Sequence, residues 1–140
     1  MLATGQEGQN PIIRIWDLKT RTCICSVGSC VKCLQFLSFS CNGEYLASVG
    51  KDSHNREQII VWNISNISQG QKPKIIAKQL SYFNILCLKF SPIDSDKLCS
   101  CGQENIRFWR IKNGHLPGSA VVLNKHSRDT VFSCLDYEFV

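Results

Sequence analysis

One short pattern recurs three times along this 140-residue chain: a run of β-branched and aromatic residues that closes on a tryptophan. The tryptophans are Trp16, Trp62 and Trp109, so successive copies lie 46 and 47 residues apart. A fixed period of a few tens of residues indicates a repeat architecture, in which each repeat is one unit that packs against its neighbours. The period therefore restricts the chain to a small set of folds before any strand is assigned.

Two other patterns recur in phase with the tryptophans. Leu-Ala-Thr, Leu-Ala-Ser and Leu-Cys-Ser each precede a turn and then the tryptophan strand. Residues 37–40, 88–91 and 135–138 alternate apolar with polar side chains at the period of a strand, although residues 34–36 fit the first copy nearly as well. Turn residues separate these runs, and no stretch has a convincing helical period. The sequence predicts an all-β fold with four short strands per repeat, named a to d.

The period is slightly longer than the roughly 40 to 45 residues of a propeller blade. We therefore expect residues 1–140 to form one partial β-propeller of about three four-stranded antiparallel blades, open at both ends. Its expected parts are strands b to d of a first blade (1–30), a second blade (31–83), a third blade (84–128) and strand a of a next blade (129–140). Strand a is expected near 31–40, 84–91 and 131–139, strand b near 2–5, 45–50 and 97–102, strand c near 12–18, 59–64 and 105–111, and strand d near 22–28, 73–80 and 118–124.

A blade of this kind needs neighbours. It has two apolar faces and hides both only by packing between other blades. We expect the remainder of the same propeller, or neighbouring chains, to supply them. In the alternative, the last strand a joins the first blade and closes a ring of three blades, but the inner strands would then be crowded.

The motifs resemble those of the WD-repeat β-propeller family over essentially the whole chain. They are Trp-Asp closing strand c, Leu-Ala-Ser in strand b and the Phe-Ser-Pro turn. Residues 3–17, with their stretched loop, are similar to the atypical repeats of the echinoderm microtubule-associated-protein-like group. Residues 99–102 and 106–109 also resemble that group, as do related ciliary and centriolar WD-repeat proteins. The Gly-His pair that precedes strand a in ordinary blades is missing at the equivalent positions, because the one such dipeptide, at 114–115, follows strand c. Ser48 and Trp62 can still pair, with Asp52 as a further partner. The structural blade positions implied by the resemblance are Trp16, Asp17, Ser48, Asp52, Trp62, Ser100 and Trp109.

The resemblance implies a non-enzymatic scaffold for protein–protein interactions, in a microtubule-associated, ciliary, axonemal or centriolar assembly of the cytoplasm. Tubulin and axonemal proteins are the partners that it suggests. Long polar loops on a rigid sheet are common binding sites, and ordinary loop divergence would look the same. The loop residues expected to contact partners are Gln6, Glu7, Asn10, Lys51, His54, Arg56, Gln103 and Glu104.

Lys72, Lys74 and Lys78 form the densest basic segment of a chain with a net charge of +5. On an outer strand these lysines would either protect the edge from unwanted pairing or face an acidic partner. The second reading gives an alternative function, a nucleic-acid-associated WD-repeat scaffold that uses this basic edge.

Catalytic, metal and cofactor sites are not predicted. Among nine cysteines only Cys30 and Cys33 have zinc-finger spacing, and no second pair of that spacing completes a tetrahedral site. We expect free, packed thiols at the pairs 23/25, 30/33 and 99/101. The histidines fall in predicted loops, and no glycine-rich phosphate loop occurs. No apolar run is long enough for a membrane span.

Overall fold

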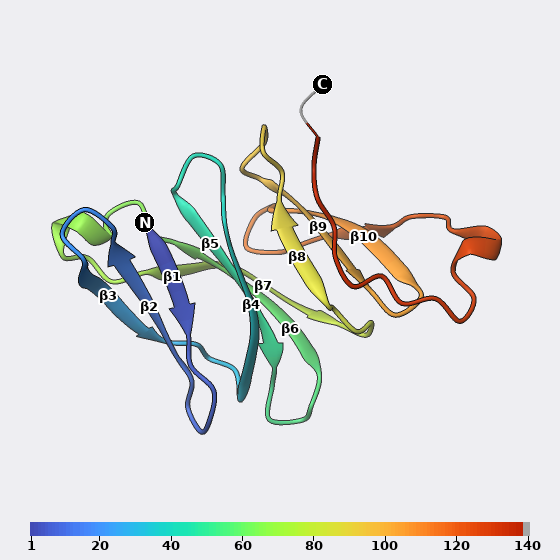
Figure 1. The fold of residues 1–140 in the computed structure, drawn as a ribbon, viewed down its shortest axis with the longest axis horizontal. Coiled ribbons are helices and arrows are strands. Elements are labelled where there is room, and N and C mark those ends of the chain that lie inside the picture. The colour runs from blue at the N-terminus through green and yellow to red at the C-terminus, as the bar shows by residue number, and fades with distance from the viewer. Residues whose placement is uncertain (139–140) are drawn as a thin grey trace.

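The computed structural model describes residues 1–138, which form eleven β-strands and two short 3-10 helices. The strands make three antiparallel sheets of three, four and four strands, arranged side by side as the blades of an open sector (Figure 1). The prediction of an all-β partial propeller is confirmed. In the described part of the chain, neither helix is long or apolar enough to cross a membrane.

Within each sheet, strands that are consecutive in the sequence lie next to each other. Blade 1 contains β1 (Leu2–Gly5), β2 (Ile12–Asp17) and β3 (Thr22–Gly28). Blade 2 contains β4 (Cys33–Phe39), β5 (Tyr45–Lys51), β6 (Glu57–Asn63) and β7 (Lys74–Ser81), with η1 (Ile67–Gln69) between its last two strands. Blade 3 contains β8 (Cys87–Phe90), β9 (Lys97–Gly102), β10 (Asn105–Arg110) and β11 (Gly118–Ala120), and η2 (Asn124–His126) follows it.

Blade 2 is buried on both faces. Alternate side chains of a strand point to opposite faces of its sheet, so Leu46 and Ile60 join the apolar cluster shared with blade 1. Ile59 and Val61 point the other way and join the cluster shared with blade 3. This explains why residues 59–62 are apolar without alternation, since both sides of the strand face core.

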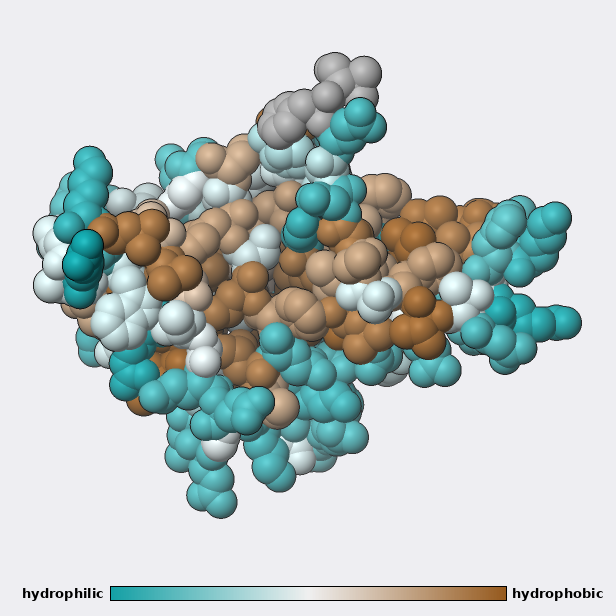
Figure 2. Space-filling model, viewed as in Figure 1, coloured by the Kyte–Doolittle hydropathy of each residue, from teal (hydrophilic) through white to brown (hydrophobic). Residues whose placement is uncertain are grey.

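The two ends of the sector remain open. Leu2 of blade 1 and Phe108 of blade 3 are about half exposed, at 48% and 51%. Trp16 is only half-buried, whereas Trp62 and Trp109 are buried against the preceding blade. In the view of Figure 2, apolar side chains are exposed at the blade 3 end of the sector, where β10 lies in Figure 1. Each end blade thus leaves one face without a partner among the described residues.

Residues 129–138 form no strand, in contrast to the prediction of a strand a near 131–139. An inner strand forms its ladder with strand b of its own blade, and none of the described residues follows to supply one. The segment instead makes one isolated bridge between Val131 and Gln103 and an ion pair between Asp136 and Lys89 at 2.7 Å. The last two residues of the predicted strand region 129–140 lie outside the described residues. β1 pairs with β2 alone, so the three-bladed ring does not close in this structure.

Leu98, which is fully buried between blades 2 and 3, tests this packing. Leu98→Ala should lower the free energy of unfolding by about 2–5 kcal/mol, because it removes buried methyl groups and leaves a cavity. Urea unfolding followed by tryptophan fluorescence measures the loss. Ile93→Ala, on an exposed turn, is the control and should change stability by less than about 0.5 kcal/mol. Equal losses in the two variants would contradict a core at this position.

Candidate functional site

Each tryptophan of strand c donates its indole N–H to a hydroxyl of strand b. The pairs are Trp16 with Thr4 at 2.9 Å, Trp62 with Ser48 at 3.1 Å and Trp109 with Ser100 at 2.8 Å. In every blade the tryptophan lies opposite a leucine, and the hydroxyl belongs to the residue two positions after that leucine. The hydrogen bond therefore ties strands b and c together in one register in all three blades.

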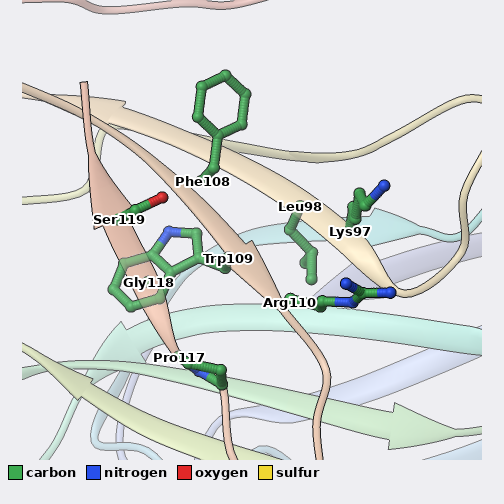
Figure 3. A pocket seen from close by; sticks show the side chains of 8 residues that line it. All are labelled: Lys97, Leu98, Phe108, Trp109, Arg110, Pro117, Gly118 and Ser119. Carbon is green, nitrogen blue, oxygen red and sulfur yellow. The ribbon is translucent and has the colours of Figure 1, made fainter.

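The junction between strands c and d differs from blade to blade. In blades 1 and 2 the register of this pairing shifts just before Trp16 and Trp62. Blade 3 has no such shift, and Gly118 of β11 lies directly opposite Trp109. A Cβ on Gly118 would lie 2.6 Å from Cε3 of the indole, which lies over β11 at this residue (Figure 3). Glycine thus makes room for the ring in blade 3.

Aspartates hold two of the turns. Asp17 Oδ1 accepts the backbone N–H of Lys19 at 2.8 Å in the c–d turn of blade 1. In the b–c turn of blade 2, Asp52 Oδ1 accepts the backbone N–H groups of His54 and Arg56, and Oδ2 pairs with the Arg56 guanidinium at 2.7 Å. These hydrogen bonds, that of the Arg56 backbone N–H foremost, lower the pKa of Asp52 to about 2. Asp52 therefore orders its own loop and makes no hydrogen bond to Trp62.

The b–c loops of blades 1 and 2 project on the same side of the molecule (Figure 1). Gln6 and Glu7 line a hollow of about 250 Å³ against strand β4 of the following blade. Lys51 and Arg56 line a hollow of about 300 Å³ against the connection between blades 2 and 3. Four of the loop residues singled out in the sequence thus lie at boundaries between blades.

Asn10 and His54 lie at exposed positions of the same two loops. Asn10 adopts a left-handed backbone with φ of 56°. The His54 ring nitrogen Nδ1 lies 3.2 Å from the Ser53 hydroxyl. Both side chains are open to solvent and line none of the hollows described here.

Gln103 and Glu104, in the short b–c turn of blade 3, contact the C-terminal segment. The Glu104 backbone N–H donates to the Thr130 carbonyl at 2.9 Å, and its Oε1 accepts the Asp129 N–H at 2.8 Å. Gln103 forms the isolated bridge with Val131. The structure thus separates these two residues from the hollows of blades 1 and 2.

Lys72, Lys74 and Lys78 are all exposed, and the last two belong to β7. This strand is at the edge of its sheet and pairs only with β6. Lysines on such an edge discourage pairing with another strand and also attract acidic partners. Their geometry is compatible with both readings.

Two grooves at blade 3 were not predicted from the sequence. One, of about 380 Å³, follows β9, β10 and β11 and is mostly apolar; Leu98, Phe108, Trp109 and Pro117 line it (Figure 3). The other, of about 250 Å³, lies between β7 of blade 2 and blade 3. Both are formed by side chains from several strands or connections, and no local sequence pattern marks such a groove.

The burial of Glu57 was also not predicted from the sequence. The residue is only 6% exposed, and neither carboxylate oxygen has a hydrogen-bond partner among the described residues. Burial raises the pKa of this carboxyl group. The position was detectable, because Glu57 continues the alternation of Ile59 and Val61, which face blade 3.

The six cysteines of the predicted pairs are all free, but only half of them are packed. Cys99 and Cys101 are buried, and burial raises the pKa of each thiol to about 11, so both stay protonated at neutral pH. Cys25 packs against the core shared by blades 1 and 2, whereas Cys23, Cys30 and Cys33 are exposed, which corrects the prediction for these three. Within residues 1–138, no three side chains of the types that bind metals are grouped to hold an ion.

The molecule is a sector of a β-propeller, in which each of the three blades has the same tryptophan–hydroxyl hydrogen bond between strands b and c. Its fold is similar to that of the β-propeller domain of Cps50 (Swd1) from Myceliophteria thermophila, with a TM-score of 0.67 at 17% sequence identity. The match covers 86% of this chain and 33% of that one. No protein-family model matches the chain.

Curated relatives agree with the fold. The chain is 32% identical over 126 residues to WD repeat-containing protein 90 of Xenopus tropicalis, and 34% identical over 125 residues to centriole proteome protein 16 of Chlamydomonas reinhardtii. These matches cover 90% and 88% of this chain but only 7% and 6% of those proteins. Echinoderm microtubule-associated protein-like 2 of Rattus norvegicus is 28% identical, with 97% of this chain and 22% of that protein covered. The chain is thus similar in sequence to WD-repeat proteins over most of its length, and it folds as a sector of a β-propeller.

The tryptophan–hydroxyl pair of blade 3 can be tested by Ser100→Ala. The change leaves the buried indole N–H of Trp109 without an acceptor and should cost about 1–3 kcal/mol of stability in urea unfolding. Thr4→Ala removes the same acceptor from the more exposed Trp16 and should cost less, because water can replace the hydroxyl. A loss no larger for Ser100→Ala than for Thr4→Ala would refute the role of burial.

The Asp52 loop should respond to acid. A pKa of about 2 in the folded state, below the ordinary value of about 4, means that the carboxylate stabilises the loop above pH 4. That contribution is lost as the pH falls towards 2. Carboxyl-carbon NMR should therefore show Asp52 titrating near pH 2, and Asp52→Asn should speed amide exchange at His54 and Arg56 at pH 7. Titration near pH 4, with unchanged exchange in the variant, would show that the loop does not depend on this carboxylate.

Proposed function

We propose that the chain is a non-enzymatic scaffold that holds protein partners against one rim of its propeller. The observation that carries the proposal is the rim itself, where the b–c loops of blades 1 and 2 project on one side and each forms a hollow with the next blade. Polar loops held by rigid sheets are frequent binding surfaces. The hydroxyl-bonded tryptophans supply that rigidity, since they fix the strands from which the loops emerge.

The proposal extends to the cellular setting. We infer a microtubule-associated, ciliary, axonemal or centriolar assembly in the cytoplasm, with tubulin or axonemal proteins as partners. The names of two relatives support this inference, one a centriole proteome protein and the other an echinoderm microtubule-associated protein-like protein. Because the chain spans less than a quarter of either relative, the support concerns the shared repeats and no other part of those proteins.

A second candidate is a nucleic-acid-associated scaffold. The observation that favours it is the set of three exposed lysines at and beside β7. Lysines bind phosphates as well as carboxylates, so this edge suits either kind of acidic partner. The sequence relatives favour the protein partner.

Cosedimentation with microtubules at low and physiological salt separates the two candidates. The triple variant Lys72→Glu, Lys74→Glu, Lys78→Glu should bind microtubules about tenfold more weakly, because it reverses three charges on one edge. Wild-type binding should weaken as salt rises.

The matched control reverses three exposed lysines elsewhere and so has the same net charge: Lys19→Glu, Lys112→Glu, Lys125→Glu. It should retain most of the binding. If wild-type protein fails to pellet with microtubules but shifts labelled RNA or DNA in a salt-sensitive way, and only the edge variant loses that shift, the nucleic-acid function replaces the one proposed.

A further inference from the structure

The groove between blades 2 and 3 is a complete feature of the described residues. Its walls come from both blades, with Leu80 and Phe83 on one side and Arg107, Trp109 and Pro117 on the other. The larger groove along β9 to β11 is lined by blade 3 alone, at an open end of the sector. The interblade groove, by contrast, has both of its walls in place.

Among residues 1–138, Arg107 is the one charged residue that lines this groove. Its guanidinium carbon lies 4.7 Å from the centre of the Phe83 ring and 5.3 Å from that of Trp109, so two aromatic faces hold the cation. Its Nε is buried without a hydrogen-bond acceptor among the described residues, and no carboxylate of residues 1–138 forms an ion pair with it. A planar guanidinium in this state fits a carboxylate by two parallel hydrogen bonds.

Tyr82 lines both the interblade groove, which Arg107 also lines, and the hollow formed with Lys51 and Arg56. It is 94% exposed, although large aromatic side chains are usually covered. The groove lies on one side of it, and the hollow lined by Lys51 and Arg56 lies on the other. Exposed tyrosine next to arginine is the composition typical of residues that dominate binding energy at protein interfaces.

The charged residues around Tyr82 favour an acidic partner. Lys51, Arg56 and Arg107 are basic. Asp52 pairs with Arg56 and balances its charge, but neither Lys51 nor Arg107 forms an ion pair among the described residues, and Glu57 is buried with a raised pKa that disfavours its charged form. A basic rim around an aromatic groove complements a segment that combines carboxylates with an apolar side chain.

We propose that the interblade groove at Tyr82, Phe83 and Arg107 binds an acidic segment of a protein partner. One carboxylate of the segment pairs with the Arg107 guanidinium, and an apolar side chain packs beside Leu80 and Trp109. The proposal rests on the scaffold function above and specifies the surface and the chemistry of its partner. It concerns a site separate from the exposed lysines at β7.

Selection from a random 12-residue peptide library displayed on phage, against the purified protein, tests the chemistry of the site. Recovered peptides should be enriched in Asp and Glu together with aromatic or aliphatic residues. Synthetic copies should bind Arg107→Gln and Tyr82→Ser at least about tenfold more weakly than wild type, as measured by fluorescence anisotropy. Copies with Gln and Asn in place of Glu and Asp should lose binding to the same extent.

Two controls separate folding from recognition. Tyr82→Ser alters a side chain that is almost fully exposed, so its unfolding midpoint in urea should match that of wild type. Lys72→Gln removes an exposed charge outside the groove and should leave peptide affinity within about twofold.

The outcomes also distinguish this site from the scaffold function. Acidic enrichment with binding lost in both groove variants supports the proposal. Selected peptides without acidic enrichment, or with equal affinity for wild type and Arg107→Gln, overturn it. If partner binding is unaffected by the groove variants but is lost in the triple lysine variant, the groove proposal fails while the scaffold function stands.

Discussion

Two-sided burial of a thin sheet is the constraint on which the rest of this structure depends. A four-stranded blade has an apolar face on each side, and only blade 2, with a blade on either side, hides both. Its central strands β5 and β6 are almost wholly buried, whereas the end blades expose residues such as Leu2 and Phe108. The stability of each blade therefore depends on its packing against the neighbouring blades, and not only on interactions within the blade.

The same boundaries create the candidate binding features. Hollows form where a loop of one blade meets the first strand or connection of the next, as Glu7 does against β4 and Arg56 against Tyr82. Arg107 takes its place between aromatic rings only because blades 2 and 3 bring Phe83 and Trp109 together. Core packing and the candidate binding features thus arise from one geometric arrangement, and a change in blade spacing would alter both.

The central strands of each blade were predictable from sequence, because the repeat period, the recurring leucine motif of strand b and the tryptophan of strand c agree there. The strand predicted near 131–139 does not form within the described residues up to 138, since alternation records which side chains can be buried but not whether a ladder partner exists. Exposed Cys23 and Cys30 show the same limit, because a small apolar side chain is covered only if a neighbour is present. The burial of Glu57 was detectable, because this residue lies at alternate positions with the buried Ile59 and Val61. The groove at Arg107 was not, because its walls come from two different blades.

The contrast at strand d has a consequence for how such repeats change over time. Blades 1 and 2 accommodate the tryptophan with a slipped register, and blade 3 uses Gly118 instead. The outermost strand can therefore gain or lose a residue while strands b and c keep their alignment. The innermost strand of blade 2 also shifts register, so insertions and deletions should accumulate on either side of the central pair, and homologous blades are best aligned on strands b and c.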